Sequence, residues 1–228
     1  MSNPDKQADR IQSMFSQISR RYDRMNRLMT AGQDSTWRRE VIRRAGLTAG
    51  SQLLDLGSGT GDLVREAIHQ QPACRAVAAD FTLGMMQAGN RRGHLDWCAA
   101  DALLLPFPFA NFDAVVSGFL MRNVQDVRKA LQEQHRVLRD GGRIIILDTT
   151  RPRRNLLYPF LWLHLHLVIP FLGAIITGQR AAYTYLPEST EKFLFAEQLS
   201  RAMTEAGFKQ VGFHRRMFGT IAIHWGQK

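Results

Sequence analysis

The middle of the chain alternates short apolar runs with segments of helical periodicity. The apolar runs lie at Gln52–Leu56, Ala76–Asp80, Phe112–Ser117 and Arg143–Asp148, and each has the length of a buried strand. A helix is predicted at Val127–Leu138, between the last two runs. Strands that alternate with helices in this way predict a parallel sheet with helices on both of its faces.

The two flanks of this region follow other patterns. Between residues 9 and 47, apolar positions recur at helical spacing, which predicts two or three helices with a break near Gly32. Toward the other end, Phe195–Gly207 is typical of a helix that ends at a glycine. Strands are predicted at Gln210–Phe218 and Thr220–Trp225, and the single residue between them indicates an antiparallel hairpin.

A third pattern is the long apolar run Asn155–Thr177, which contains no Asp, Glu, Lys or Arg. It is roughly long enough to span a bilayer, but Pro159 and Pro170 argue against one continuous helix. Because arginines precede the run, we hypothesise that it lies at an anionic membrane surface or forms the apolar mouth of a site. The alternative is a buried pair of helices over the sheet.

The chain is strongly basic, with 30 Lys and Arg against 20 Asp and Glu and a formal net charge of +10. Such a surplus attracts nucleic acid or an anionic membrane surface, although it also serves solubility alone. Cys74 and Cys98 form neither a metal-binding pattern nor a disulfide framework, so no metal site is predicted. A polar N-terminal stretch without a secretory signal leads us to expect a cytoplasmic protein.

The sharpest motif is the glycine-rich loop after the first predicted strand. Gly57, Gly59 and Gly61 alternate with other residues, and a helix is predicted to begin near Asp62. Such glycines let the backbone approach a ligand closely and offer N–H donors at a helix N-terminus. Dinucleotide-binding loops prefer another spacing, and a carboxylate such as Asp55 would repel a pyrophosphate but suits an ammonium group. The loop therefore favours S-adenosylmethionine over NAD.

Two more carboxylates follow strands farther along the chain. Asp80, with Phe81 beside it, closes the second predicted strand, where its carboxylate can accept from both ribose hydroxyls. Asp101 follows the next strand and can accept from the adenine amino group. An isolated aspartate is more often a helix cap or a solvated residue. The order and spacing of the three features together favour a cofactor site.

Several other segments resemble one family, the ubiquinone/menaquinone biosynthesis C-methyltransferases, which belong to the class I methyltransferases. The resemblance runs from about Met14 to Gly226 and implies a Rossmann-like, seven-stranded, mostly parallel sheet with an antiparallel C-terminal hairpin and a helical lid. The segments that carry it are Phe15–Asn26 with Trp37 and Arg38, Met121–Val124, His135–Arg143 and Tyr183–Ser189.

One methyltransferase domain is expected over residues 1–228. Within it, residues 1–47 would form the N-terminal part of the lid and residues 48–150 the cofactor-binding core. Residues 151–192 would be an apolar insertion facing substrate or membrane, followed by the C-terminal helix and hairpin at 193–228.

The resemblance also implies roles for individual residues. The family's cofactor contacts fall on Thr60, Asp80, Asp101 and Ala102, and Tyr22 is a candidate to close over the cofactor. The remaining positions line the expected substrate side, where this chain departs from the family pattern. Ser117 and Gly118, which are also candidates for cofactor binding, stand near the family's usual serine. Leu120 replaces a glycine, and Asp148 begins a segment that is usually Glu-Phe-Ser.

The reaction implied is methylation of a ring carbon on a polyprenylated hydroquinone such as a demethylmenaquinol. A ring carbon becomes nucleophilic when an adjacent hydroxyl loses its proton, so the quinol and not the quinone should react. Arg122 is a candidate to hold the phenolate, Asn123 to orient it and Tyr185 to contact it from the covering segment. Glu188 and His166 are weaker candidates from the same segment, and His166 is more typical of an ordinary interior or interfacial residue.

Other functions compete with this hypothesis. The enzyme could methylate another apolar phenol, or RNA as the basic charge suggests, and a non-catalytic scaffold is a third alternative. The apolar run is unusual for an enzyme that acts on RNA, and the intact glycine loop argues against a scaffold. The expected partners are a lipid-soluble quinol and the inner membrane face as a peripheral contact, without nucleic acid. The oligomeric state stays open.

Overall fold

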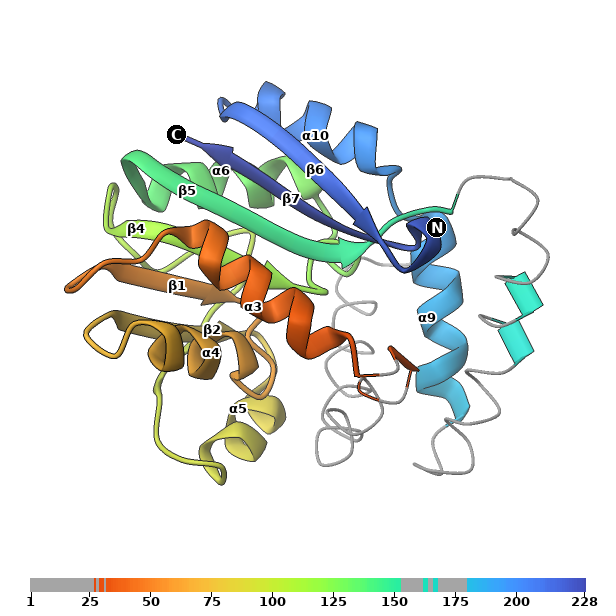
Figure 1. The fold of residues 1–228 in the computed structure, drawn as a ribbon, viewed down its shortest axis with the longest axis horizontal. Coiled ribbons are helices and arrows are strands. Elements are labelled where there is room, and N and C mark those ends of the chain that lie inside the picture. The colour runs from red at the N-terminus through yellow and green to blue at the C-terminus, as the bar shows by residue number, and fades with distance from the viewer. Residues whose placement is uncertain (1–26, 28, 31, 153–161, 164–165, 168–179) are drawn as a thin grey trace.

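A computed structural model describes residues 27, 29–30, 32–152, 162–163, 166–167 and 180–228. These residues form one sheet with helices on both faces (Figure 1). The Tyr22 and His164 positions and most of the apolar run 155–177 lie outside the described residues.

The sheet has seven strands in the order β3-β2-β1-β4-β5-β7-β6. The pairs from β3 to β5 are parallel, whereas β7 is antiparallel to both β5 and β6. The predicted fold class is therefore confirmed, including the C-terminal hairpin. The strands are β1 (Gln52–Leu56), β2 (Arg75–Asp80), β3 (Asp96–Ala99), β4 (Phe112–Gly118), β5 (Leu138–Thr149), β6 (Lys209–Arg216) and β7 (Ile221–Gln227).

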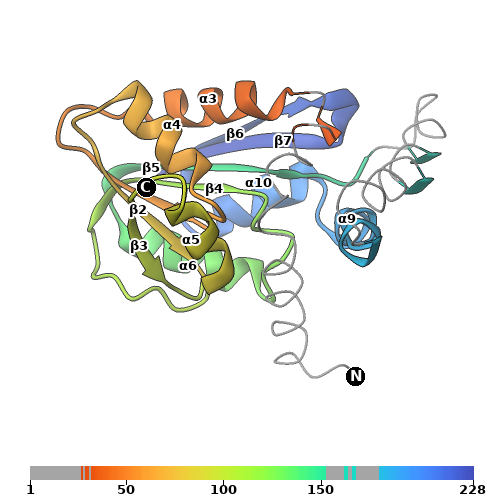
Figure 2. The same ribbon diagram turned by 90° about the horizontal axis from the view of Figure 1, so that it is seen from below.

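The helices cover the sheet in two layers (Figure 2). One layer contains α3 and α4, and the other contains α6 and α10. The helix α5 contacts β2, and α9 stands beyond the end of the sheet where the parallel strands finish (Figure 1). The bounds are α3 (Asp34–Ala45), α4 (Asp62–Gln70), α5 (Leu83–Asn90), α6 (Val127–Val137), α9 (Arg180–Lys192) and α10 (Ala196–Glu205).

Each central strand is apolar on both faces because it supplies two separate cores. In β5, Ile144 and Ile146 pack with α6 and α10, whereas Ile145 and Leu147 pack with α3 and α4. The side-chain alternation of a strand produces this division, and it explains why the strands read as continuous apolar runs.

The C-terminal connection is longer than predicted. Instead of Gly219 alone, a 3-10 turn at Met217–Gly219 joins β6 to β7. Phe218 takes a left-handed conformation there with φ 54° and is 74% exposed. The strand prediction was wrong here because Met217 and Phe218 continue the apolar pattern although their backbone has already turned.

The order of the strands places the site. In the sheet β1 pairs with β2 on one side and with β4 on the other, and the chain crosses from β3 at one edge back to β4, so the strand order reverses between β1 and β4. In open α/β sheets, ligands bind at the carboxyl ends of the strands beside such a reversal. Among the described residues, no helix is both long and apolar enough to cross a membrane.

Candidate active site

The glycine loop joins the end of β1 to the start of α4 and needs its glycines. Gly57, Gly59 and Gly61 have φ values of 68°, 58° and 84°, a region that side chains with a Cβ atom disfavour. A Cβ atom at Gly61 would also lie 2.5 Å from Leu95 Cδ1. The sharp turn and the close packing thus both depend on glycine.

Replacing Gly61 with alanine is expected to lower the free energy of unfolding by about 2–5 kcal/mol. About 1–2 kcal/mol of this comes from the left-handed backbone, and a further 1–3 kcal/mol from overpacking against Leu95. Urea unfolding followed by circular dichroism measures the change. Gly50→Ala is the matched control, because Gly50 has φ 81° but no atom lies within 4 Å of the place that an added Cβ would take. Equal losses in the two variants would contradict the packing argument.

The N–H groups of the loop are largely used within the protein. Gly57 and Ser58 donate to the carbonyl of Ala79 at 2.8 and 3.0 Å, and Gly61 donates to Ser58 at 2.8 Å. Gly59 donates to Asp80 Oδ2 at 2.7 Å. The expectation that the loop offers its N–H groups to a ligand is therefore wrong for these four residues. Gly57 and Gly59, both with positive φ values, direct their amides toward β2.

Asp55 lies at the base of the pocket and lacks a counter-charge at hydrogen-bond distance. It is 1% exposed, and neither carboxylate oxygen has a partner at ordinary hydrogen-bond geometry among the described residues, although the Val64 backbone lies near enough to oppose the rise of its pKa. Burial, followed by the nearby negative charge of Asp80, raises the pKa of Asp55 to about 8. A buried polar group without a partner calls for a ligand that supplies one, and an ammonium group fits both the charge and the position.

Asp80 closes β2 as predicted and is held in place by backbone donors. Gly59 donates to Oδ2 and Thr82 to Oδ1, each at 2.7 Å. Burial raises its pKa, and the hydrogen bonds from Thr82 and Gly59 oppose that effect. A carboxylate oxygen accepts more than one hydrogen bond, so a carboxylate fixed in this way can also accept from the two hydroxyls of a ribose.

The residues predicted to contact adenine lie at the ends of β2 and β3, outside the lining of the described pocket. Phe81 is 48% exposed beside Asp80, and Asp101 is exposed after β3. The Asp101 Oδ1 atom accepts from the Leu103 amide at 2.9 Å, which fixes the carboxylate. Ala102 is buried in the core, so only its backbone can face a ligand.

The wall opposite the glycine loop is the end of β4. Gly118 and Phe119 line the pocket together with the loop residues. Ser117 is fully buried, and its hydroxyl has no hydrogen-bond partner among the described residues. Phe119 has φ 62°, a strained conformation for an aromatic residue. Its amide donates to the Leu147 carbonyl at 2.7 Å, which holds the strained turn against β5.

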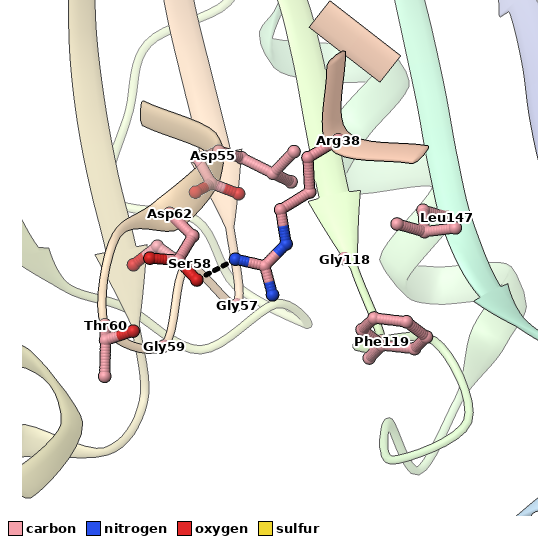
Figure 3. A pocket seen from close by; sticks show the side chains of 11 residues that line it. Arg38, Asp55, Gly57, Ser58, Gly59, Thr60, Asp62, Gly118, Phe119 and Leu147 are labelled. Atoms are coloured by element: carbon pink, nitrogen blue, oxygen red, sulfur yellow. Dashed lines mark hydrogen bonds and ion pairs between the residues drawn. The ribbon is translucent and has the colours of Figure 1, made fainter. Parts of the chain in front are cut away.

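Six residues that line the pocket were missing from the candidate site, namely Arg38, Ser58, Asp62, Leu63, Phe119 and Leu147. Arg38 is the basic one among them. Arg38, on α3, reaches the glycine loop and forms an ion pair with Asp62 (Figure 3). Asp62 pairs on its other oxygen with Arg92 at 2.7 Å. The sequence did point to Arg38, because Trp37 and Arg38 are among the positions that resemble the family. Only the packing of α3 on the sheet shows that the arginine side chain points to the glycine loop (Figure 3).

In the turn after β4, Arg122 forms a buried ion pair with Asp148. The Arg122 Nη1 atom lies 2.7 Å from Asp148 Oδ1, and the two side chains are 6% and 1% exposed. The Thr149 amide donates to the same oxygen at 2.7 Å. The pairing follows from the parallel contact between β4 and β5. Arg122 lies just beyond the end of β4 and Asp148 near the end of β5, so the two side chains meet at the same edge of the sheet. The sequence identified Asp148 as a departure from the family pattern but did not predict its ion pair with Arg122.

Asn123 and Tyr185 meet although 62 positions separate them in the sequence. The Tyr185 hydroxyl donates to Asn123 Oδ1 at 3.1 Å, and Asn123 Nδ2 donates to the Phe119 carbonyl at 3.1 Å. This chain of contacts connects α9 to the pocket wall at Phe119. The three residues predicted for catalysis thus lie around one turn at the end of β4.

The weaker candidates do not join this group. Glu188 is exposed, and His166 stacks on Trp162 and lies 3.3 Å from Glu191. No cluster of His, Cys, Asp and Glu suited to a metal ion occurs within the described ranges.

The residues at this edge fit S-adenosylmethionine. Asp55 suits its ammonium, Asp80 its ribose and the Asp101 loop its adenine. A pyrophosphate would face the buried Asp55 and a loop in which four amides already donate to protein atoms.

Comparison with known proteins agrees with this fit. The profile of the ubiE/COQ5 methyltransferase family matches residues 3–228. The ubiquinone/menaquinone biosynthesis C-methyltransferase of Desulfotalea psychrophila is 42% identical over 96% of this chain and 90% of its own. The demethylmenaquinone methyltransferase of Thermus thermophilus is 40% identical over 94% of this chain and 100% of its own.

Solved structures confirm the fold alone. A methyltransferase from Thermotoga maritima, described as a possible histamine N-methyltransferase, has a TM-score of 0.65 at 18% identity, over 95% of this chain and 98% of its own. Phosphoethanolamine N-methyltransferase 2 of Haemonchus contortus has a TM-score of 0.64 at 14% identity, over 85% of this chain and 52% of its own. The family profile and the two relatives at 40–42% identity show that the chain belongs to the ubiE/COQ5 methyltransferase family and is an S-adenosylmethionine-dependent methyltransferase.

Proposed function

We propose that this protein transfers a methyl group from S-adenosylmethionine to a ring carbon of a polyprenylated hydroquinone, of the demethylmenaquinol type, in quinone biosynthesis. The observation that carries the proposal is the arrangement of Arg122, Asn123 and Tyr185 around the end of β4, beside the cofactor pocket. The printed functions of relatives at 39–42% identity support the same substrate class.

The reaction joins an electron-rich ring carbon to an electrophilic methyl group. S-adenosylmethionine supplies that methyl group on a sulfonium ion when it is bound. The acceptor's ring carbon gains electron density when its neighbouring hydroxyl is deprotonated, so the protein has to favour the phenolate. It also has to hold the carbon near contact distance of the methyl group and exclude water.

Arg122 is suited to stabilise the phenolate. Its guanidinium uses Nη1 for Asp148 and makes no other side-chain hydrogen bond within the described part of the chain. A guanidinium carries five N–H donors, so other donors can face an acceptor oxygen while Asp148 fixes their direction. Burial strengthens such a contact because the local dielectric is low.

Asn123 and Tyr185 are suited to position the acceptor ring. Because Tyr185 comes from α9 and Asn123 from the β4 turn, their hydrogen bond fixes the distance between the covering helix and the pocket wall. A ring bound beside this hydrogen bond would be shielded from water by α9.

Removing the Tyr185 hydroxyl is expected to slow methyl transfer about 5- to 10-fold, the cost of one neutral hydrogen bond. Affinity for S-adenosylhomocysteine should stay unchanged in Tyr185→Phe, since the residue lines the acceptor side. Steady-state kinetics and calorimetry separate the two effects. In an Asn123→Ala background, Tyr185→Phe should add little further loss, and an additive loss would refute the proposed coupling.

Contact with an anionic membrane is part of the proposal, because a polyprenyl tail resides in the bilayer. Three described residues of the 151–192 segment support it, since Trp162, Leu163 and Leu167 are 44–56% exposed. The formal net charge of +10 adds attraction to anionic lipid.

The protein is therefore expected to sediment with phosphatidylglycerol vesicles at low salt and less so at high salt. Leu163→Glu should weaken binding several-fold, because a charge replaces an apolar contact. Phe109→Glu is the matched control, since Phe109 is also exposed but lies near the opposite edge of the sheet. No sedimentation at low salt, or equal losses in both variants, would argue against this surface.

The substrate class is tested with S-adenosylmethionine labelled in the methyl group. Lipid extract containing demethylated quinones is offered with and without dithionite, and bulk RNA is offered separately. Label is expected in the lipid fraction only after reduction. Label in RNA, or in no fraction despite measurable cofactor binding, would overturn the proposal.

A further inference from the structure

The amino-acid end of the cofactor carries a carboxylate as well as an ammonium, and the glycine loop does not offer that carboxylate a ready site. The amides of Gly57, Ser58, Gly59 and Gly61 all donate to other protein atoms. An anion that reaches these four amides finds them already used, so a positively charged side chain nearby favours its binding.

Arg38 is the one basic side chain among the described residues that line the pocket. Its side chain is 13% exposed. Figure 3 shows it extending from α3 to the glycine loop, near Asp55 of β1. Arg38 also lies near enough for its positive charge to act on Asp55 and oppose the rise of that pKa. A cation and an unpartnered carboxylate thus border the same space.

We propose that Arg38 binds the carboxylate of the cofactor's amino-acid end, so that Arg38 and Asp55 together recognise the zwitterion. This inference rests on the use of S-adenosylmethionine but not on the proposed identity of the methyl acceptor. It makes helix α3, outside the glycine-loop core, part of the cofactor site.

The ion pairs around Asp62 allow Arg38 to change partner. Asp62 keeps Arg92 on its other oxygen at 2.7 Å, so its charge stays compensated when Arg38 turns to a ligand. Arg38 itself stays near Asp34, 3.5 Å away on the same helix. A planar guanidinium can hold a carboxylate through two parallel hydrogen bonds.

Helix α3 is firmly attached, which fixes the place of Arg38. Glu40 pairs with Arg44 at 3.0 Å and with Arg216 of β6 at 2.6 Å. The Cζ atom of the Arg44 guanidinium also lies 3.9 Å from the ring centroid of Trp225 on β7. The helix therefore presents Arg38 from a rigid base, and little ordering accompanies binding.

Three related ligands test the assignment by calorimetry, without any methyl acceptor. S-adenosylhomocysteine has both charged groups, its decarboxylated form lacks only the carboxylate, and 5′-methylthioadenosine lacks the whole amino-acid end. The intact protein should prefer S-adenosylhomocysteine over the decarboxylated form about 10- to 100-fold, as expected for a hydrogen-bonded ion pair.

In Arg38→Met this preference should fall to about twofold or less, with affinity for 5′-methylthioadenosine unchanged. Arg38→Lys keeps the charge without the fork and should retain part of the preference. Arg39→Met is the matched control, because exposed Arg39 bonds Thr36 through its side chain and does not line the pocket.

An unchanged preference in Arg38→Met would overturn the assignment, and so would an equal loss for all three ligands, which would indicate a purely structural role. If Arg38→Met does not fold, the full preference surviving in Arg38→Lys together with full loss in Arg39→Met would also overturn it. Failure of quinol methylation would leave these binding results intact, so the two proposals fail separately.

Discussion

Replacing Asp55 with asparagine is expected to weaken S-adenosylhomocysteine binding about 100-fold, in line with the roughly 2–3 kcal/mol of a hydrogen bond to a charged group. The same substitution is expected to stabilise the ligand-free protein near neutral pH. The two effects have one cause, since Asp55 is buried without a partner until the ammonium arrives.

The pH dependence follows from the raised pKa. In the unfolded chain Asp55 has an ordinary pKa near 3.8, whereas burial raises it to about 8 in the folded protein. Between these values the folded state holds a proton that the unfolded state has released, so this group's contribution to stability decreases as the pH rises from about 4 to 8. Asparagine cannot ionise, and the variant should lack this decrease.

Ligand binding should show the opposite trend. The ammonium prefers the ionised carboxylate, so below about pH 8 binding must expel the Asp55 proton, and affinity should rise by up to about tenfold per pH unit. Calorimetry in buffers with different ionisation enthalpies measures the release directly. The protein should release about one proton near pH 6, and Asp55→Asn should release almost none.

Asp140→Asn serves as control, because Asp140 is an exposed carboxylate on β5 outside the pocket. Melting temperatures from pH 5 to about pH 8 complete the test, with each kcal/mol worth about 2–4 °C for a chain of this size. Equal pH profiles of the protein and of Asp55→Asn would contradict the role assigned to Asp55.

Replacing Arg122 with methionine is expected to cost about 3–5 kcal/mol of stability, because it leaves Asp148 buried without its cation. Methyl transfer should fall at least about 100-fold, because the phenolate loses its nearest positive charge. Loss of activity in this variant alone would not separate catalysis from folding.

The double variant Arg122→Met/Asp148→Asn separates them. It removes both charges, and the amide oxygen of the new side chain can still accept from the Thr149 amide, so most of the stability should return. Activity should stay as low as in the single variant. Urea unfolding and single-turnover methyl transfer measure the two quantities. Wild-type transfer by the stable double variant would exclude Arg122 from the reaction.

The strands could be predicted from the sequence because the physics that forms them is local. Runs such as Ile144–Leu147 are apolar at every position, as the two cores require. The carboxylates at their ends then belong to one edge, because parallel strands finish at the same side of a sheet. This reasoning placed Asp55 and Asp80 correctly beside the glycine loop.

What could not be predicted depends on backbone direction and on the docking of distant elements. The glycine pattern does not tell whether the loop amides face a ligand or β2, because the φ values decide it. The position of Arg38 depends on how α3 packs on the sheet, and the pairing of Arg122 with Asp148 on the neighbour relation of β4 and β5. Predictions for Tyr22 lie outside the described residues.

The central claim, methylation of a quinol ring carbon, is tested most directly with purified enzyme, demethylmenaquinone and 13C-methyl-labelled S-adenosylmethionine. After reduction to the quinol, we expect a single new methyl resonance at an aromatic carbon, and none with the oxidised quinone. A methyl resonance typical of an ether, or transfer that is equally fast to the oxidised form, would contradict the phenolate mechanism and the substrate proposed.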